Sequence, residues 1–428
     1  MSNRPISILL AGTALLLACS QKMEFQPEAV SVRRRTAVSY WNSAVPLGDK
    51  SFVVILAFSD LFTVHQGSGK SLYNFYDAFL NGHAADGTTA RSIGLKGSAR
   101  EYWKDNSNGA FLPRFHVLTM DGNCFKNSLE YYGTDSSVMG SDTHTGELYY
   151  EVVTHFHEEL EGFRNNPEFV EEDGELSSLI ILYPGYGQSA FPYRGNLIWP
   201  GAGRTYAPAL IEYSGLRFHT KMLCCEFSAS GKPDLGTFCH EFAHVIGLPD
   251  VYDTDGSTNG TATSLPGAYS LMGLGLGKAG GTCPPCLTSV EKDIYMGDIW
   301  GQSPVEPANG QFTELRPVSS GDFIRIENRS GGEYIYVEYR NGKGWDSLLK
   351  PNVLVYHVDR SANKVGPVSA GERWKHGAML NAFASHPCYY KLSGDEPLNP
   401  LDWGGEPFGR RITLERPFTA QAARVGIM

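Results

Sequence analysis

The sequence predicts an α+β fold in two parts, with buried strands and helices first and a β-rich part from about residue 305. Before that point, short apolar runs typical of buried strands alternate with stretches whose apolar residues recur every three or four positions. After it, short runs of alternating polarity dominate. The 48 glycines, 24 prolines and 12% aromatic residues indicate many turns and much β-structure.

The composition is that of an ordinary folded chain, with 42% hydrophobic and 19% charged residues. A length of 428 residues suffices for about three domains of roughly 150 residues each. The net charge of -10 is spread along the chain without a basic block. Because phosphate binding needs clustered Lys and Arg, this pattern argues against nucleic acid as a partner.

The N-terminus predicts an exported lipoprotein. One early arginine precedes an apolar run over residues 6–17, which has the length of a signal-peptide core and is too short to span a membrane. The run ends in Leu-Leu-Ala-Cys at Cys19, which resembles the bacterial lipobox. We therefore expect residues 1–19 to be a lipoprotein signal peptide with Cys19 lipidated, and residues 20–50 to be a tether. A lipid on Cys19 would anchor the protein to the outer membrane or cell surface; a chance cysteine after an ordinary signal peptide is the alternative.

The first part of the chain reads as strands and helices in turn. Residues 51–60 and 176–187 predict buried strands, residues 71–82 have helical spacing, and residues 147–163 predict one core-facing helix. We interpret His155 and His157 in that last helix as satisfied or solvated side chains rather than metal ligands.

The C-terminal part contains three alternating runs, "DFIRIENR", "EYIYVEYR" and "NVLVYHVD", that predict hairpin-like strands. We therefore divide the chain into a domain over 51–304 and a β-rich part over 305–428, whose tail from about 391 stays unassigned.

Seven cysteines follow Cys19, and an odd number in an exported chain leaves at least one unpaired. "CPPC" at 283–286 has metal or redox spacing, but the chain has no second CxxC. A local disulfide or buried thiols are therefore favoured over a structural zinc site.

The segment "HEFAHVIGLPDVYD", residues 240–253, carries the clearest chemistry. A helix that begins near Pro233-Asp234 would place its apolar residues on one stripe and the two histidines on the opposite side. Imidazoles one helical turn apart, with a glutamate after the first, form the HExxH zinc motif. His240 and His244 would bind the metal, and Glu241 would lie beside the metal-bound water.

A catalytic zinc needs a third protein ligand and an open position. Gly247 would end the helix and let the chain turn back, so that Asp250, six residues after His244, becomes the third ligand. Asp253 also lies within reach, and that alternative stays open. "DTDG" at 253–256 is acidic enough for a structural Ca²⁺ but matches no complete loop pattern, which favours a solvated turn.

With these motifs, the chain resembles the immune inhibitor A family of secreted bacterial zinc metalloproteases. The resemblance extends in order over roughly residues 50–390 and includes "VVILAFSD" (53–60), "GSAREYWKDNSNGAF" (97–111), "SSLIILYPGYG" (177–187), "IWP" (198–200), "HEFAHVIGLPDVYDTDG" (240–256), "YSLMG" (269–273), "LTSVEKDIYMGDIW" (287–300) and "YIYVEYRNGKGWDSLLKPNVLVYHVD" (334–359).

The resemblance implies a metzincin-like zincin fold, with a mixed sheet and an active-site helix below a cleft, so that residues 51–304 are the catalytic domain. Met272, in a glycine-flanked turn, is similar to the Met-turn below such a zinc. His240, His244 and Glu241 carry over as zinc pair and general base.

We therefore expect a monomeric zinc-dependent endopeptidase that acts on protein or peptide substrates outside the cytoplasm. Zinc would polarise the scissile carbonyl and lower the pKa of its water, and Glu241 would pass the proton to the leaving amine. Tyr252 and Tyr269 are candidate donors to the oxyanion. Two alternatives are an inactive zincin scaffold that serves as a surface binding lipoprotein, which the intact HExxH disfavours, and a zinc hydrolase of non-peptide amides.

Overall fold

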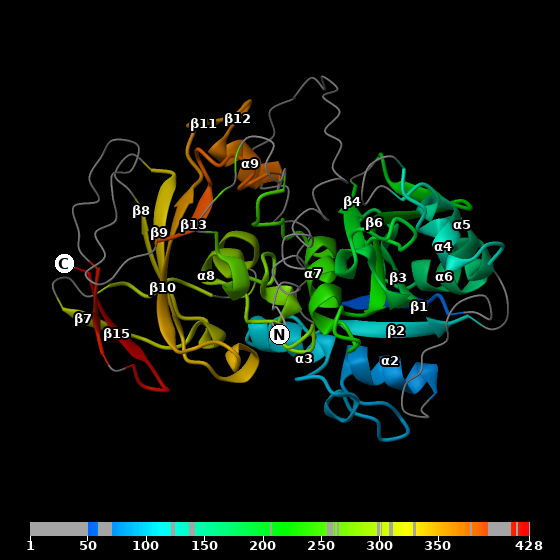
Figure 1. Cartoon of the computed structure of the whole chain (residues 1–428), viewed down its shortest axis with the longest axis horizontal. Helices are drawn as coiled ribbons and strands as arrows, with labels where there is room; N and C mark the ends of the chain where they lie inside the picture. Colours follow the sequence, from blue (N-terminus) through cyan, green and yellow to red (C-terminus); the bar gives the residue numbers. More distant parts are fainter. Residues whose placement is uncertain are drawn as a thin grey trace, which may run out of the picture.

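The computed structural model describes residues 50–58, 71–120, 125–136, 142–205, 208–254, 260, 262, 265–297, 300, 302–307, 311–327, 331–376, 379–392, 412–416 and 418–427. The predicted signal peptide, tether and lipidated Cys19 lie outside these residues. Figure 1 shows two neighbouring β-sheet regions with helix α7 between them.

The first region is built on a six-stranded mixed sheet with the order β2-β1-β3-β6-β4, in which β5 also pairs with β6. Its parallel strands are β1 (Ser51–Leu56), β2 (Arg114–Thr119), β3 (Leu176–Tyr186) and β6 (Leu216–Phe227). The strands β4 (Gly201–Arg204) and β5 (Ile211–Tyr213) run antiparallel to β6. All six residues of β1 are buried, as its continuous apolar run predicts for a strand covered on both faces.

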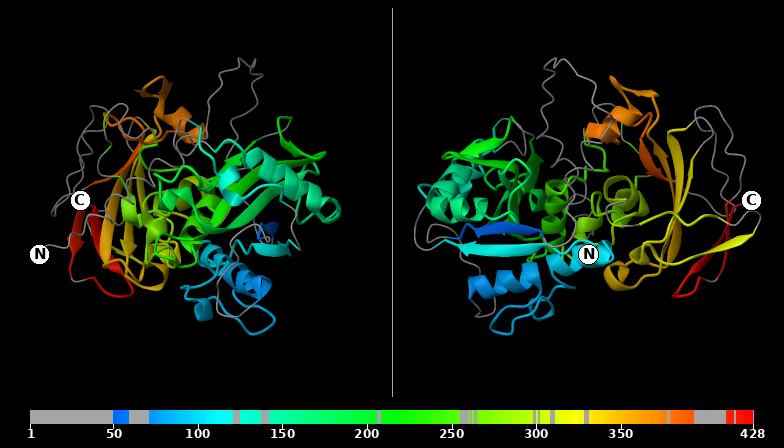
Figure 2. Two further views of the ribbon diagram at one scale, coloured as in Figure 1. Left: turned by 45° about the vertical axis from the view of Figure 1, so that its right-hand side comes forward. Right: turned by 180° about the vertical axis from the view of Figure 1, so that it is seen from behind.

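Alternation along β1 separates two hydrophobic cores. Val54 and its even-numbered neighbours face one core, together with α2 (Leu72–Asn81), α3 (Ala99–Asn106) and α7 (Leu235–Val245). Val53 and Ile55 face the other core, together with α4 (Leu129–Tyr132), α5 (Thr145–His155) and α6 (His157–Arg164). The sheet is therefore the middle layer between two groups of helices, as the views in Figure 2 show.

The single helix predicted over 147–163 is wrong. Two helices, α5 and α6, meet at Phe156, whose φ of -100° and ψ of 25° leave the helical region. The buried Phe156 ring still lies in the same core as the apolar residues on either side of it. The apolar spacing is therefore the same with or without the break, and the sequence pattern could not reveal it. His155 is exposed, and the ring of His157 lies 3.2 Å from the Ser214 carbonyl oxygen, as expected for solvated or satisfied side chains.

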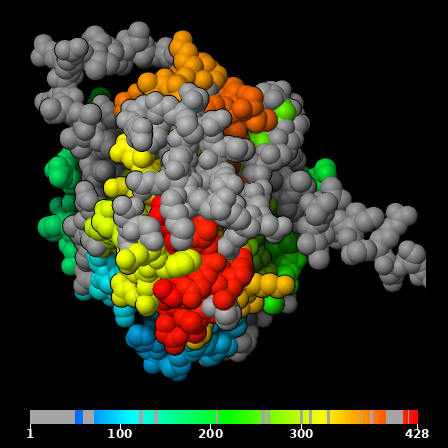
Figure 3. All heavy atoms as spheres, turned by 90° about the vertical axis from the view of Figure 1, so that its left-hand side faces the viewer, coloured from blue at the N-terminus to red at the C-terminus, as the bar shows by residue number. Residues whose placement is uncertain are grey.

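The C-terminal part consists of antiparallel sheets, as the alternating runs predict. One has the order β13-β10-β9-β8 and another the order β14-β15-β7. Their strands are β7 (Phe312–Leu315), β8 (Ile324–Glu327), β9 (Glu333–Arg340), β10 (Asn352–Asp359), β13 (Tyr389–Lys391), β14 (Ile412–Glu415) and β15 (Ala423–Ile427). A small ribbon, β11 (Lys364–Val365) and β12 (Val368–Ser369), precedes α9 (Ala370–His376). The tail beyond residue 391 thus contributes two strands, and Figure 3 shows red residues of this tail beside yellow residues at the same end of the molecule.

Strand β9 faces two cores at once. Ile335, Val337 and Tyr339 pack in a core between the two C-terminal sheets. Tyr336, on the other face, belongs to the same core as helix α7. The two parts of the chain therefore share a continuous apolar core.

Short helical segments fill the connections. They are η2 (Arg91–Ile93), η3 (Gln188–Ala190), η4 (Gly267–Tyr269), η5 (Gly275–Gly277), α8 (Ser289–Glu291), the π-helical η6 (Lys292–Met296), η8 (Val318–Ser320) and η9 (Gly344–Asp346). Within the described ranges, no helix has the length and apolar character needed to cross a bilayer.

The cysteines of "CPPC" are buried free thiols rather than a disulfide. This outcome is one of the two that the sequence favoured. Burial raises the pKa of both Cys283 and Cys286, which keeps them as unreactive thiols.

Candidate metal centre

Helix α7 begins at an aspartate cap, close to the predicted start. Asp234 accepts the Thr237 backbone N–H at 3.0 Å and the Thr237 hydroxyl at 2.7 Å, which satisfies an orphan donor of the first turn. Burial raises the pKa of Asp234 to about 6. Gly236 permits a close approach of the chain around η5, because a Cβ there would lie 1.8 Å from the Leu276 carbonyl oxygen.

The other end of α7 turns the chain back toward the histidines. Gly247 has a φ of 106°, a left-handed conformation that glycine adopts without steric cost. Its N–H donates to the His244 carbonyl at 3.0 Å, and the Leu248 N–H donates to the Ala243 carbonyl at 2.9 Å. These two bonds form a Schellman motif. The predicted role of Gly247 as helix terminator therefore has a defined geometry.

This turn brings Asp250 to both histidines. The Nε2 atoms of His240 and His244 each lie 3.3 Å from the same atom, Asp250 Oδ1. A tetrahedral zinc with bonds of about 2.0–2.2 Å holds its ligand atoms roughly 3.3–3.5 Å apart. The spacing of these two pairs therefore fits a zinc ion, and the donor set of two nitrogens and one oxygen is the type that zinc prefers. Among the described residues, these three form the sole group of at least three His, Cys, Asp or Glu side chains with metal-like proximity.

Both imidazoles are oriented from behind by backbone carbonyls. His240 Nδ1 donates to the Leu271 carbonyl at 3.1 Å, and His244 Nδ1 donates to the Leu248 carbonyl at 2.7 Å. Because a carbonyl only accepts, each Nδ1 carries a proton, and each Nε2 is left on the side of the ring that faces Asp250. The sequence did not reveal these acceptors, although Leu271 adjoins the Met272 turn that it singled out.

The three side chains also form a coupled electrostatic unit. Burial acts to lower the pKa of His244, but the neighbouring Asp250 carboxylate outweighs it and raises that pKa to about 9. Burial acts to raise the pKa of Asp250, but the two histidines hold it well below its usual value. The Asp250 carboxylate thus stabilises positive charge on the neighbouring imidazole.

Glu241 lies between the two histidines in α7 and is 2% exposed. Its negative charge contributes to raising the pKa of His244, after the contributions of burial and Asp250, so the carboxylate lies within electrostatic reach of this candidate metal ligand. The group of three possible metal ligands does not include Glu241.

The remaining predicted residues differ in their burial and in their hydrogen-bond partners. Met272 is fully buried in the core that contains α7, and its carbonyl accepts the Val251 N–H at 3.1 Å. Tyr252 is 3% exposed and Tyr269 is partly buried. Asp253 is not part of the group of possible metal ligands; its Oδ2 accepts the Ala262 N–H at 3.0 Å. The rest of the predicted calcium turn, residues 255 and 256, lies outside the described residues.

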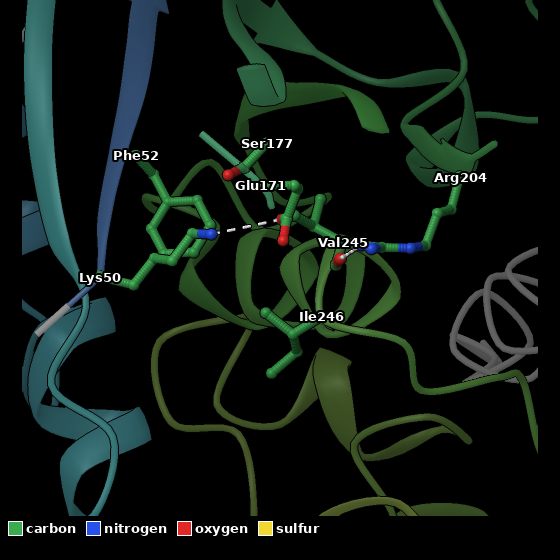
Figure 4. A pocket seen from close by; sticks show the side chains of 7 residues that line it. All are labelled: Lys50, Phe52, Glu171, Ser177, Arg204, Val245 and Ile246. Carbon is green, nitrogen blue, oxygen red and sulfur yellow. Dashed lines mark hydrogen bonds and ion pairs between the residues drawn. The ribbon is translucent and has the colours of Figure 1, made fainter. Parts of the chain in front are cut away.

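A separate small pocket lies at the C-terminal end of α7 (Figure 4). Arg204, the last residue of β4, donates there to the Val245 carbonyl at 3.1 Å, and its cation complements the negative end of the helix dipole. Lys50 and Glu171, which also line the pocket, form an ion pair at 3.3 Å. None of the seven lining residues is one of the candidate metal ligands. The pocket is therefore distinct from the candidate metal centre.

The fold and the site together define a metal-dependent peptidase. The family model described as immune inhibitor A peptidase M6, catalytic domain, matches residues 40–302. This match covers more than half of the chain, and the chain therefore belongs to this family of metallopeptidases, as its sequence motifs indicated.

Individual relatives match smaller regions. The pre-pro-metalloprotease PrtV of Vibrio cholerae serotype O1 is 26% identical over 231 residues, which is 48% of this chain and 24% of the relative. Immune inhibitor A of Bacillus thuringiensis subsp. alesti is 28% identical over 151 residues, which is 33% of this chain and 21% of the relative. The aligned regions thus span about a quarter or less of these relatives.

Proposed function

We propose that this protein is a zinc-dependent endopeptidase with a metzincin-like zincin fold that hydrolyses peptide bonds of extracellular proteins. The observation that carries the proposal is the convergence of His240 Nε2, His244 Nε2 and Asp250 Oδ1. Membership of a metallopeptidase family supports it independently. The mixed sheet with antiparallel β4 next to α7 supports the proposed fold.

His240, His244 and Asp250 would hold the metal, and zinc would supply Lewis-acid polarisation of the scissile carbonyl. Glu241 acts as general base: it takes a proton from the attacking water and delivers it to the leaving amine. Glu241 is buried and adjoins His240 in the helix, which places its carboxylate close to the proposed metal ligands. A hydroxyl from Tyr252 or Tyr269 would donate to the developing oxyanion.

We expect purified protein that lacks residues 1–19 to contain one zinc and to cleave casein. Phenanthroline should abolish cleavage, and added zinc should restore it, because the three ligands need the metal to form a reactive site. Metal content by mass spectrometry and casein cleavage in the same sample measure both properties. Full cleavage in metal-stripped protein would rule out the proposal.

The same experiment, with a small non-peptide amide as a second substrate, separates the two alternatives. An inactive zincin scaffold would bind zinc without cleaving casein or any amide substrate. A zinc hydrolase of non-peptide amides would bind zinc and hydrolyse a small amide while casein stays intact. The buried Glu241 beside the metal ligands favours a catalytic site.

We further propose that Cys19 carries a lipid that anchors the protein outside the cytoplasm, with residues 51–304 as its catalytic domain and 305–428 as a β-rich part. The motive is the Leu-Leu-Ala-Cys ending of the apolar N-terminal run. Cys19→Ser should move the protein from the detergent phase to the aqueous phase, or leave it unprocessed. Wild-type protein without a lipid mass shift, in the same fraction as the variant, would contradict the anchor.

A further inference from the structure

The segment 269–272 lies against the metal centre and is tied to it by two backbone carbonyls. The Leu271 carbonyl accepts the Nδ1 proton of His240 at 3.1 Å. The next carbonyl, that of Met272, accepts the N–H of Val251 at 3.1 Å, directly after the ligand Asp250. This short segment therefore contacts one metal ligand and the loop that carries another.

The same segment is held from its other side by charged groups. The Tyr269 carbonyl accepts Arg340 Nη2 at 3.3 Å. The Ser270 hydroxyl donates to the Glu291 carboxylate, which is 1% exposed. Each of the four residues in 269–272 is thus fixed by a hydrogen bond: one to His240 in α7, one to the loop after Asp250, and two to a buried polar cluster. In Figure 1, α8, which contains Glu291, lies between α7 and the C-terminal sheet.

Arg340, at the end of β9, is the centre of this polar cluster and is 0% exposed. Its guanidinium has five N–H donors, and five acceptors surround it. They are Glu338 Oε1 at 2.7 Å, Asp346 Oδ1 at 2.9 Å, the Cys286 carbonyl at 2.9 Å, the Tyr269 carbonyl at 3.3 Å and the Leu287 carbonyl at 3.4 Å. A buried arginine with all donors engaged has one allowed orientation, because any shift leaves a buried donor unpaired.

We propose that Arg340 and Glu291 are positioning residues for the metal ligand His240, which they orient through the segment 269–272. This inference rests on the proposed zinc-peptidase function. The family model ends at residue 302, whereas Arg340 comes from the C-terminal β-rich part. The C-terminal sheet is thus a structural component of the metal centre and not an independent appendage.

The physical basis is that the orientation and tautomer of a metal-binding imidazole are set by the hydrogen-bond partner of its other ring nitrogen. The Leu271 carbonyl fixes both the tautomer and the ring plane of His240. If the segment 269–272 becomes mobile, the Leu271 carbonyl no longer holds the His240 ring in a single orientation, and the direction of Nε2 varies. Loss of such an outer partner typically weakens metal affinity about 10- to 100-fold.

Ser270→Ala is the smallest test, since it removes a single hydroxyl and its bond to Glu291. Arg340→Lys keeps the charge but loses the planar fork that reaches the Tyr269 carbonyl. We expect either variant to raise the zinc Kd about 10-fold, measured by competition with a chromophoric chelator. The absorption spectrum of the Co²⁺-loaded protein should also change, because it reports ligand geometry rather than stability.

Val337→Ala is the matched control. Val337 lies on β9 but faces the core between the C-terminal sheets, so its truncation weakens the same strand without reaching 269–272. We expect its zinc Kd and Co²⁺ spectrum to match those of the wild type, and its thermal unfolding to occur at lower temperature.

The outcomes distinguish the inference from the proposed function. Wild-type affinity and an unchanged spectrum in folded Ser270→Ala would overturn the inference alone. An equal loss of affinity in Val337→Ala would also overturn it, because the effect would then follow general stability. If the wild-type protein binds no zinc, the proposed function fails and this inference fails with it.

Discussion

Glu241→Ala should retain zinc and lose peptide hydrolysis by a factor of about 10² to 10⁴. The reason is that the variant removes the proposed base while His240, His244 and Asp250 keep their convergent geometry. Zinc content by mass spectrometry and kcat/KM on a quenched fluorescent peptide give the two values. KM should change little, because proton transfer belongs to the transition state rather than to substrate binding.

Glu241→Gln is the control that separates chemistry from packing. Glu241 is almost completely buried, and alanine there leaves a cavity that can disturb α7. Glutamine fills the same space but cannot accept the proton of water. Both variants should be equally inactive if the carboxylate is the base. Activity restored by glutamine, or zinc lost from either variant, would show that Glu241 has a structural or ligand role instead.

Asp250→Ala should lose zinc at micromolar chelator concentrations at which the wild type and Asp253→Ala keep it. Asp250 Oδ1 lies 3.3 Å from both histidine Nε2 atoms, so its loss leaves two protein ligands of three. Asp253 instead binds the backbone N–H of Ala262. Zinc retention in the two variants, measured at equal chelator, tests the assignment of the third ligand directly.

Asp253→Ala is also a control for general damage near the site. Removal of its carboxylate leaves the buried N–H of Ala262 without this acceptor, which costs about 1–3 kcal/mol of stability. The two variants should therefore show opposite patterns: Asp250→Ala loses metal, whereas Asp253→Ala loses stability but keeps its metal. If Asp253→Ala lost the metal and Asp250→Ala kept it, the spacing interpretation of the third ligand would be wrong.

Much of the metal centre could be predicted because its determinants are local in sequence. His240 and His244 are one helical turn apart, and this spacing alone places their rings together on α7. Gly247 specifies the left-handed turn, and that turn brings Asp250 back three residues later. Propensity, capping and ligand spacing all act within about ten residues here.

The buried strands could be predicted for the same reason. The apolar runs that form β1 and β3 and the alternating runs that form β8, β9 and β10 carry their period in the sequence itself. The break at Phe156 escaped prediction, because a one-residue departure from helical φ and ψ leaves the apolar stripe unchanged.

The sequence by itself determined which side chains converge as candidate metal ligands and which segments become the strands around them. Only the tertiary structure decided what holds those ligands in place. The carbonyl partner of His240 lies 31 residues away along the chain, and Arg340 reaches Tyr269 across 71 residues. The tail strands β14 and β15 likewise acquire a role only by pairing with each other and with β7. The local spacing of apolar residues carries no information on such contacts, since they form only when the shared core brings distant elements together.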